Sequence, residues 1–184
     1  TFTSSAYAPF GFYDYYNEKC GKQCLTTKIL SEDKLDYKSS ANGVKILNLL
    51  GYDSISDLEL HKNPSILNKY DKIILLHNEY VSKKMFDAVT AHNNIIFLYP
   101  NALYAEIEVD ISKNEITLIR GHGYPPGINN GFNYEIEEKF HEYEYDSTCL
   151  DWEFIKFENG YALNCYPEQA IWQNSLLLKA LKEL

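Results

Sequence analysis

Long hydrophobic runs and clusters of basic residues are both missing from this chain of 184 residues. No apolar stretch approaches the roughly 20 residues that a membrane-spanning helix needs. The 17 Lys and Arg residues are outnumbered by 26 Asp and Glu residues, which gives a formal net charge of −9. Because proteins bind phosphate backbones through clustered cations, we expect neither a membrane span nor a nucleic-acid partner.

Methionine is almost absent, since Met85 is the only one, and the chain opens with TFTSSAYAPF. No charged and then apolar signal segment precedes the first predicted element. We therefore interpret the chain as a processed product, a trimmed piece or a fragment of a longer protein. A length of 184 residues with 45% hydrophobic residues is enough to bury one core, and we predict a single domain over residues 1–184.

The motifs that present a catalytic nucleophile are also absent. A glutaminase holds its Cys in Gly-x-Cys-x-Gly and an esterase holds its Ser in Gly-x-Ser-x-Gly, on a tight turn after a strand. The four cysteines of this chain lie instead in KCGK, QCLT, TCLD and NCYP. None of these segments follows an apolar strand, which excludes amidotransferase chemistry.

The four cysteines are even in number and are spaced unlike a zinc site, which usually has two close pairs. Pairing between neighbours in the sequence joins Cys20 to Cys24 and Cys149 to Cys165. Disulfides form in oxidising compartments, so we expect an extracellular or cell-surface protein, with free thiols as the alternative.

Strands and helices alternate through the first two thirds of the chain. Aliphatic runs at residues 72–76 and 94–98 predict buried parallel strands. Between them Ser82 begins a helix whose inner face carries Met85, Phe86 and Val89. Weaker patterns predict strands at 2–5 and 52–56 and a helix at 39–51. This order predicts an α/β three-layer sandwich with a mainly parallel, flavodoxin-like sheet.

The last third of the chain has the pattern of hairpins. Residues 105–110 and 115–119 flank one short turn, and residues 152–158 and 161–164 flank Asn159-Gly160, a strong hairpin signal. Residues 121–148, rich in Gly, Pro, Asn and Tyr, predict a long loop. A C-terminal helix that opens at residues 166–168 places Leu177, Leu181 and Leu184 on one face.

The stretch IILLHNEYVS changes from aliphatic to polar at His77. In open α/β sheets, ligands bind beyond the carboxyl ends of the strands. Tyr99 and Asn101 follow the next predicted strand, and Tyr7 follows the first. We therefore predict one ligand-binding crevice, lined by Tyr7, His77, Glu79, Tyr80, Tyr99 and Asn101.

Two interpretations of this crevice are open. In a catalytic one, His77 is a general base oriented by Glu79, and Asn101 stabilises an oxyanion. In a purely structural one, His77 and Asn78 cap the strand, and Glu79 or Ser82 caps the next helix. The glycine-rich stretch RGHGYPPG adds His122 as a ligand-binding candidate on a loop that closes over an anion. The alternative is that this stretch is only an irregular connection. The tyrosine-rich segments at 11–16 and 143–145 suit a wet interface or a packed surface loop.

The runs LLHNEYVSKKMFDAV, NNIIFLYPNALYAEIEVD and NEITLIRG resemble the C-terminal domain of the large subunit of the N,N-dimethylformamidase family, over roughly residues 40–120. The resemblance implies a class I glutamine-amidotransferase-like fold. It also implies an iron site of two tyrosines and a glutamate, of which Tyr80 is the one ligand that carries over by motif. Iron or zinc is therefore the candidate cofactor. Two departures are Tyr99-Pro100-Asn101 where the family has Gly-Gly-Asn, and Val81 where it often has Trp.

Three functions follow from these patterns. We favour a non-catalytic binding or assembly domain of an extracellular or cell-surface protein, whose partner is a small molecule or another protein. The second is a metal- or His/Glu-dependent amide hydrolase that resembles the formamidase. The third is a structural subunit that assembles with itself into a homo-oligomer or filament through its tyrosine-rich loops.

Overall fold

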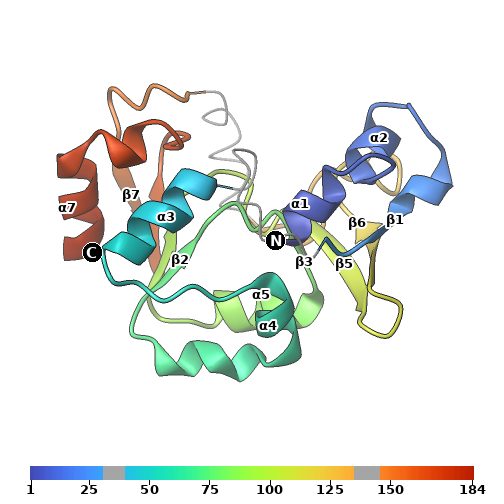
Figure 1. The fold of residues 1–184 in the computed structure, drawn as a ribbon, viewed down its shortest axis with the longest axis horizontal. Helices are drawn as coiled ribbons and strands as arrows, with labels where there is room; N and C mark the ends of the chain where they lie inside the picture. The colour runs from blue at the N-terminus through green and yellow to red at the C-terminus, as the bar shows by residue number, and fades with distance from the viewer. Residues whose placement is uncertain (31–39, 135–145) are drawn as a thin grey trace.

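The structure is a computed structural model that describes residues 1–30, 40–134 and 146–184 (Figure 1). Its strands form two four-stranded sheets. Sheet A has the order β1 (Thr26–Lys28), β6 (Glu115–Arg120), β5 (Ala105–Asp110) and β3 (Tyr80–Val81). Sheet B has the order β2 (Ile73–Leu75), β4 (Ile95–Phe97), β8 (Gly160–Leu163) and β7 (Phe154–Phe157).

Helices cover and connect the two sheets. The α-helices are α1 (Phe2–Ala6), α2 (Phe12–Tyr16), α3 (Ala41–Leu49), α4 (Asp57–Lys62), α5 (Lys83–Thr90) and α7 (Ser175–Glu183). Short 3-10 helices are η1 (Lys22–Leu25), η3 (Pro64–Lys69) and η5 (Ala170–Trp172). The predicted α/β class is confirmed, and the arrangement is compatible with a three-layer sandwich.

The prediction of one mainly parallel sheet needs a correction: the strands form two mixed sheets, and sheet A is not mainly parallel. In sheet A only β3 and β5 are parallel, whereas β1, β6 and β5 pair antiparallel. Sheet B has parallel pairs between β2, β4 and β8 and an antiparallel pair between β7 and β8. The physical reason is the short connections of the two C-terminal hairpins, because a short turn can join only antiparallel strands.

The aliphatic strands lie where the sequence predicts them. Successive side chains of a strand point to opposite faces of its sheet. Ile73 belongs to one hydrophobic core together with Val89 of α5. Its neighbour Ile74 packs against a second core that contains Leu47 of α3 and Leu177 of α7. Sheet B is therefore buried on both faces, as the unbroken aliphatic runs indicate.

Two predicted strands do not form. Residues 2–5 belong to α1, in which the Thr1 side chain accepts a hydrogen bond from the backbone N–H of Ser4 and caps the helix. Residues 52–56 form no strand, and Ser56 instead caps α4 by accepting from the Glu59 N–H. Both segments are too short for their pattern to separate a strand from a capped turn. The predicted helix at 39–51 is observed as α3, with residue 39 outside the described part of the chain.

The second hairpin shows why a glycine occupies position 160. The observed turn consists of Glu158 and Asn159, because Phe157 pairs with Gly160. A Cβ atom at position 160 would lie 1.9 Å from the carbonyl oxygen of Ile95 in β4. Gly160 is therefore required by the close approach of the neighbouring strand and not by the turn.

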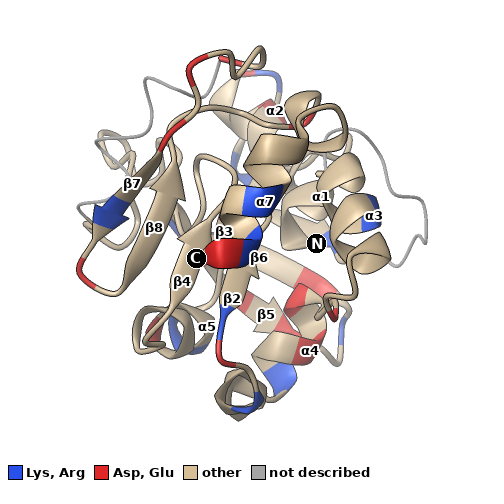
Figure 2. Cartoon of the chain, turned by 90° about the vertical axis from the view of Figure 1, so that its left-hand side faces the viewer, with Lys and Arg blue, Asp and Glu red and all other residues tan. Residues whose placement is uncertain are grey.

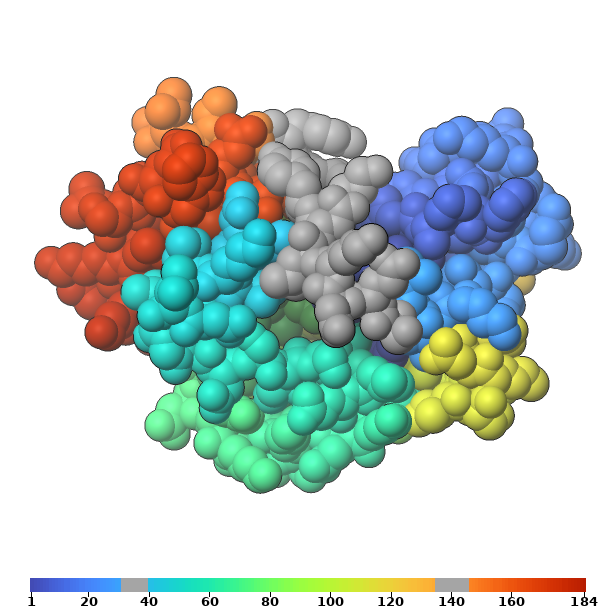
Figure 3. Space-filling view, viewed as in Figure 1, coloured from blue at the N-terminus to red at the C-terminus, as the bar shows by residue number. Residues whose placement is uncertain are grey.

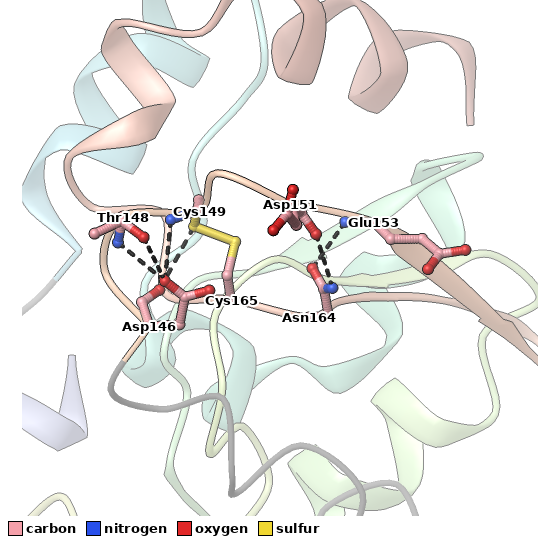
Figure 4. The surroundings of a disulfide bond; sticks show 7 residues. All are labelled: Asp146, Thr148, Cys149, Asp151, Glu153, Asn164 and Cys165. Atoms are coloured by element: carbon pink, nitrogen blue, oxygen red, sulfur yellow. Dashed lines mark hydrogen bonds between the residues drawn. A yellow bond between two sulfur atoms is a disulfide. The ribbon is translucent and has the colours of Figure 1, made fainter.

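Both predicted disulfides are confirmed. Cys20 is bonded to Cys24, and Cys149 is bonded to Cys165. Figure 4 shows the second bond, beside which the Asp146 carboxylate accepts hydrogen bonds from the N–H and hydroxyl of Thr148 and from the N–H of Cys149. The disulfide joins this turn to the segment that follows β8.

Charged residues of both signs are spread over the elements. In the cartoon of Figure 2, Lys and Arg lie on several separate elements, with Asp and Glu among them. Within the described ranges of the chain, no helix has the length and apolar character that crossing a bilayer requires.

Candidate functional site

The polar residues after β2 lie where the chain passes from one sheet to the other. Residues 76–79 connect β2 of sheet B to β3 of sheet A, and residues 98–104 connect β4 to β5 in the same direction. These two crossings run side by side, because the Leu103 N–H donates to the Asn78 carbonyl at 2.8 Å and the Tyr104 N–H donates to the Glu79 carbonyl at 2.9 Å. The predicted crevice residues therefore come together through a pair of crossings and not at the edge of one sheet.

The crossings have unusual backbone geometry. His77 has φ 57° and Asn101 has φ 63°, both in the left-handed region that few non-glycine residues adopt. His122, in the glycine-rich loop, has φ 51°. Such conformations concentrate at binding and catalytic sites, where the surrounding structure holds them in place.

Thr3 of helix α1 holds the first crossing, residues 76–79, in place. The Thr3 hydroxyl donates to the His77 carbonyl at 2.8 Å and accepts from the Glu79 N–H at 3.3 Å. Asn78 accepts from the Leu76 N–H at 2.9 Å and donates to Asp57 at 2.6 Å. The structural interpretation is therefore correct for Asn78, whose side chain caps the strand.

His77 and Glu79 lie side by side, but no hydrogen bond joins their side chains. Their side chains are 9% and 1% exposed. Nε2 of His77 lies 3.8 Å from Oε2 of Glu79, beyond hydrogen-bond distance. Burial lowers the pKa of His77 to about 4, which leaves the imidazole neutral at pH 7. Oε1 of Glu79 accepts from the Tyr13 hydroxyl at 3.1 Å, so the carboxylate orients a phenol.

Tyr99 links His77 to the N-terminus of α3. The His77 and Tyr99 rings are nearly parallel, with centroids 6.5 Å apart, and Tyr166 lies edge-on to both. The Tyr99 hydroxyl donates to the carboxylate of Glu168. The other oxygen of Glu168 accepts from the Asn42 N–H in the first turn of α3 at 2.9 Å. A carboxylate is stabilised at this end of a helix, and burial raises the pKa of Tyr99 well above its ordinary value, so the phenol stays neutral.

The opposite side of Glu79 carries further tyrosines and His122. The hydroxyls of Tyr7 and Tyr13 are hydrogen-bonded, and the Tyr13 ring meets His122 edge-on with centroids 4.4 Å apart. The Tyr80 hydroxyl is hydrogen-bonded to Nδ1 of His122. Burial lowers the pKa of His122 to about 4 and raises that of Tyr80, so both side chains are neutral at pH 7.

These contacts define one connected group, here called the strand-end cluster. Its members are Tyr7, Tyr13, His77, Glu79, Tyr80, Tyr99 and His122. Six of the seven are residues that the sequence predicts as ligand-binding. Asn101, the remaining candidate, lies two residues beyond Tyr99 and is 8% exposed.

Three buried polar atoms around the cluster have no hydrogen-bond partner among the described residues. They are Nδ1 of His77, Oδ1 of Asn101 and Oγ of Ser40. Ser40 precedes α3, the helix whose N-terminus contacts Tyr99 and Glu168. Since buried polar groups are nearly always hydrogen-bonded in native proteins, these atoms point to a bound polar molecule or ordered water.

Tyr80, the iron ligand that the formamidase resemblance carries over, is not free to bind a metal ion in this structure. Its hydroxyl is already shared with His122, and its raised pKa disfavours the phenolate that would bind iron. Within residues 1–30, 40–134 and 146–184, no group of three His, Cys, Asp or Glu side chains is placed to hold a metal ion.

No family model and no curated sequence matches this chain. The formamidase resemblance therefore stays an expectation from motifs. The site is interpreted from its own geometry.

Sequence reasoning missed Thr3, Tyr13 and Glu168. Tyr13 lies in the tyrosine-rich segment at 11–16, which is the one available signal. Glu168 reaches Asn42 across 126 residues, and no local pattern reveals such a contact. The second tyrosine-rich segment, residues 143–145, lies outside the described residues.

Proposed function

We propose that this chain is a non-catalytic binding domain of an extracellular or cell-surface protein, and that it holds a small polar molecule against the strand-end cluster. The observation that carries the proposal is the set of unpartnered polar atoms on His77, Asn101 and Ser40. Leaving such an atom buried and unpaired costs about 1–3 kcal/mol. A ligand that supplies the missing hydrogen bonds recovers this cost.

Two further features support binding over hydrolysis. Burial lowers the pKa of His77 to about 4, which makes it a weak base, and it is not hydrogen-bonded to Glu79, so a strong general base with an orienting carboxylate is not assembled. Every described cysteine is in a disulfide, which removes the thiol nucleophile. The two disulfides also support the extracellular or cell-surface location, because such bonds persist in oxidising compartments.

The test is native mass spectrometry of the protein purified without denaturation, followed by release of any bound molecule. We expect an excess mass in the wild type that is lost in His77→Gln. His61→Gln is the matched control, since His61 is 8% exposed and bonds Ser82 outside the cluster. Equal retention in both variants, or a wild type that retains nothing and binds no polar compound in a thermal-shift screen, would contradict the proposal.

The amide hydrolase is the second candidate, favoured by the proximity of His77 and Glu79 within one buried cluster. Metal analysis of the native protein and a formamide hydrolysis assay separate it from the binding domain. Stoichiometric iron or zinc that is lost in Tyr80→Phe, together with turnover, would replace our proposal.

Self-assembly is the third candidate, and the exposed side chains of Phe10, Leu49 and Leu150 favour it. They are 74%, 83% and 83% exposed. Sedimentation velocity over a range of concentrations tests it, because an assembling subunit sediments faster as its concentration rises.

A further inference from the structure

A cavity of about 190 Å³ lies beside β2, separate from the strand-end cluster. Four consecutive residues, Ile73 to Leu76, line it. Alternate side chains of a strand point to opposite faces, so a cavity that touches all four lies along the edge of the strand. β2 is the outermost strand of sheet B.

The opposite wall is the segment of residues 52–55, which forms no strand. The space in which a neighbouring strand would pair with β2 is thus left open between α3 on one side and α4 and η3 on the other. In the space-filling view, α3 and the segment after it lie on the near face of the molecule (Figure 3).

The body of the cavity is apolar. Val44 and Leu47 come from α3, Leu60 and Leu67 from α4 and η3, and Val89 from α5. For comparison, an engineered apolar cavity of about 150 Å³ binds benzene. A volume of about 190 Å³ therefore suits a single ring or a branched aliphatic group with a short side chain, and it is too small for a folded partner.

The end of the cavity beside the carboxyl end of β2 is acidic. Asp57 is 3% exposed, and its two oxygens accept hydrogen bonds from the Phe2 N–H and the Asn78 amide, each at 2.6 Å. No Lys, Arg or His of the described chain forms an ion pair with this carboxylate. A buried carboxylate without a cation is costly.

Two further charged side chains line the cavity, Lys72 and Asp53. Lys72 lines the amino-terminal end of β2, and its ammonium donates to the carbonyls of Leu181 and Lys182 at 3.2 and 3.4 Å. The Lys72 ammonium is therefore held by hydrogen bonds to the backbone of α7. Asp53 adds a second acidic side chain to the lining, and the chain carries a net charge of −9, which attracts cations.

We propose that this cavity binds a small primary amine with an apolar body. The ammonium supplies the missing positive charge and up to three N–H donors to Asp57, and the hydrocarbon fills the space between α3, η3 and α5. Within one motif, His77 thus serves the strand-end cluster, and Asn78 holds Asp57 at the second site.

The test is isothermal titration calorimetry of the chain with 2-phenylethylamine, 2-phenylethanol and 3-phenylpropanoate. These probes share a ring and differ in charge. We expect the amine to bind at least tenfold more tightly than the alcohol, and the acid to bind more weakly still. Equal affinity for the three, or no binding of the amine, would overturn the proposal, as would binding of an extended apolar peptide in place of the amine.

Two variants locate the site. Asp57→Asn is expected to reduce the amine affinity at least tenfold while the alcohol affinity stays within twofold, and Asp87→Asn on the exposed face of α5 is the control. Val44→Phe fills the cavity and is expected to abolish binding of all three probes. Unchanged amine affinity in Val44→Phe would place the amine elsewhere and refute the site. If Asp57→Asn fails to fold, the affinities of the three probes for the wild type and for Val44→Phe still test the proposal.

Discussion

Replacing Cys149 and Cys165 by alanine is expected to lower the free energy of unfolding by about 3 kcal/mol. The bond joins residues 16 apart in the sequence. Its main effect is to restrict the unfolded chain, and the chain-entropy model gives about 3 kcal/mol for a loop of this length. Asn164 still ties the same segment together without the bond, because its side chain bonds the Glu153 N–H at 2.7 Å and the Asp151 carbonyl at 3.2 Å. The native hairpin should therefore survive.

The Cys20–Cys24 bond provides an internal control. Its partners are 4 residues apart, and the same model gives about 2 kcal/mol for so short a loop. Urea denaturation of the wild type and of the two double-alanine variants measures both losses by linear extrapolation. A larger loss for the Cys20–Cys24 variant, or no loss for the Cys149–Cys165 variant, would refute loop closure as the source of stabilisation.

Three other changes have defined outcomes. Burial lowers the pKa of His77 and His122 to about 4, so the unfolded chain takes up protons between about pH 6.5 and pH 4 while the folded chain does not. The free energy of unfolding should therefore fall as the pH is lowered through this window, and a His77→Gln, His122→Gln double variant that keeps the full slope would contradict this reasoning. Glu168→Ala leaves a buried hydroxyl and a backbone N–H without their acceptor, so it should lower the free energy of unfolding, measured by urea denaturation, by about 2–4 kcal/mol. Glu168→Gln should lower it less. Equal losses in the two variants would show that the acceptor is unimportant. Gly51→Ala should lower the free energy of unfolding by about 1–2 kcal/mol, because Gly51 has φ 88° but open space around it. Gly160→Ala should lower it several-fold more, and similar melting temperatures of the two variants would refute the steric argument.

Elements set by local chemistry could be predicted from the sequence. The aliphatic runs became β2 and β4, and the two hairpins became β5–β6 and β7–β8, because each depends on neighbours within a few residues. The division into two sheets could not be predicted. It depends on β1 and β3, which are 3 and 2 residues long and are defined only by the strands with which they pair.

Most residues of the candidate site could be predicted from the sequence, but the contacts between them could not. The rule that ligands bind beyond strand ends selected His77 and Tyr99, and the structure brings these two residues together because both crossings between the sheets start at such ends. The residues that orient them come from distant segments. Thr3 reaches His77 across 74 residues and Tyr13 reaches Glu79 across 66, and sequence periodicity contains no information at that range.

The position of α1 has a consequence for biosynthesis. Phe2 and Ala6 are 1% and 0% exposed, and Phe2 is tied to Asp57 through its N–H. At the other end of the chain, β8 completes sheet B by pairing with β4 from residue 160 onward. Residues 2–6 are therefore synthesised before the partners against which they pack, and their apolar side chains are exposed until those partners follow. This part of the protein should therefore fold only after residues 160–163 have been made, and α1 is the segment that a chaperone would need to shield until then.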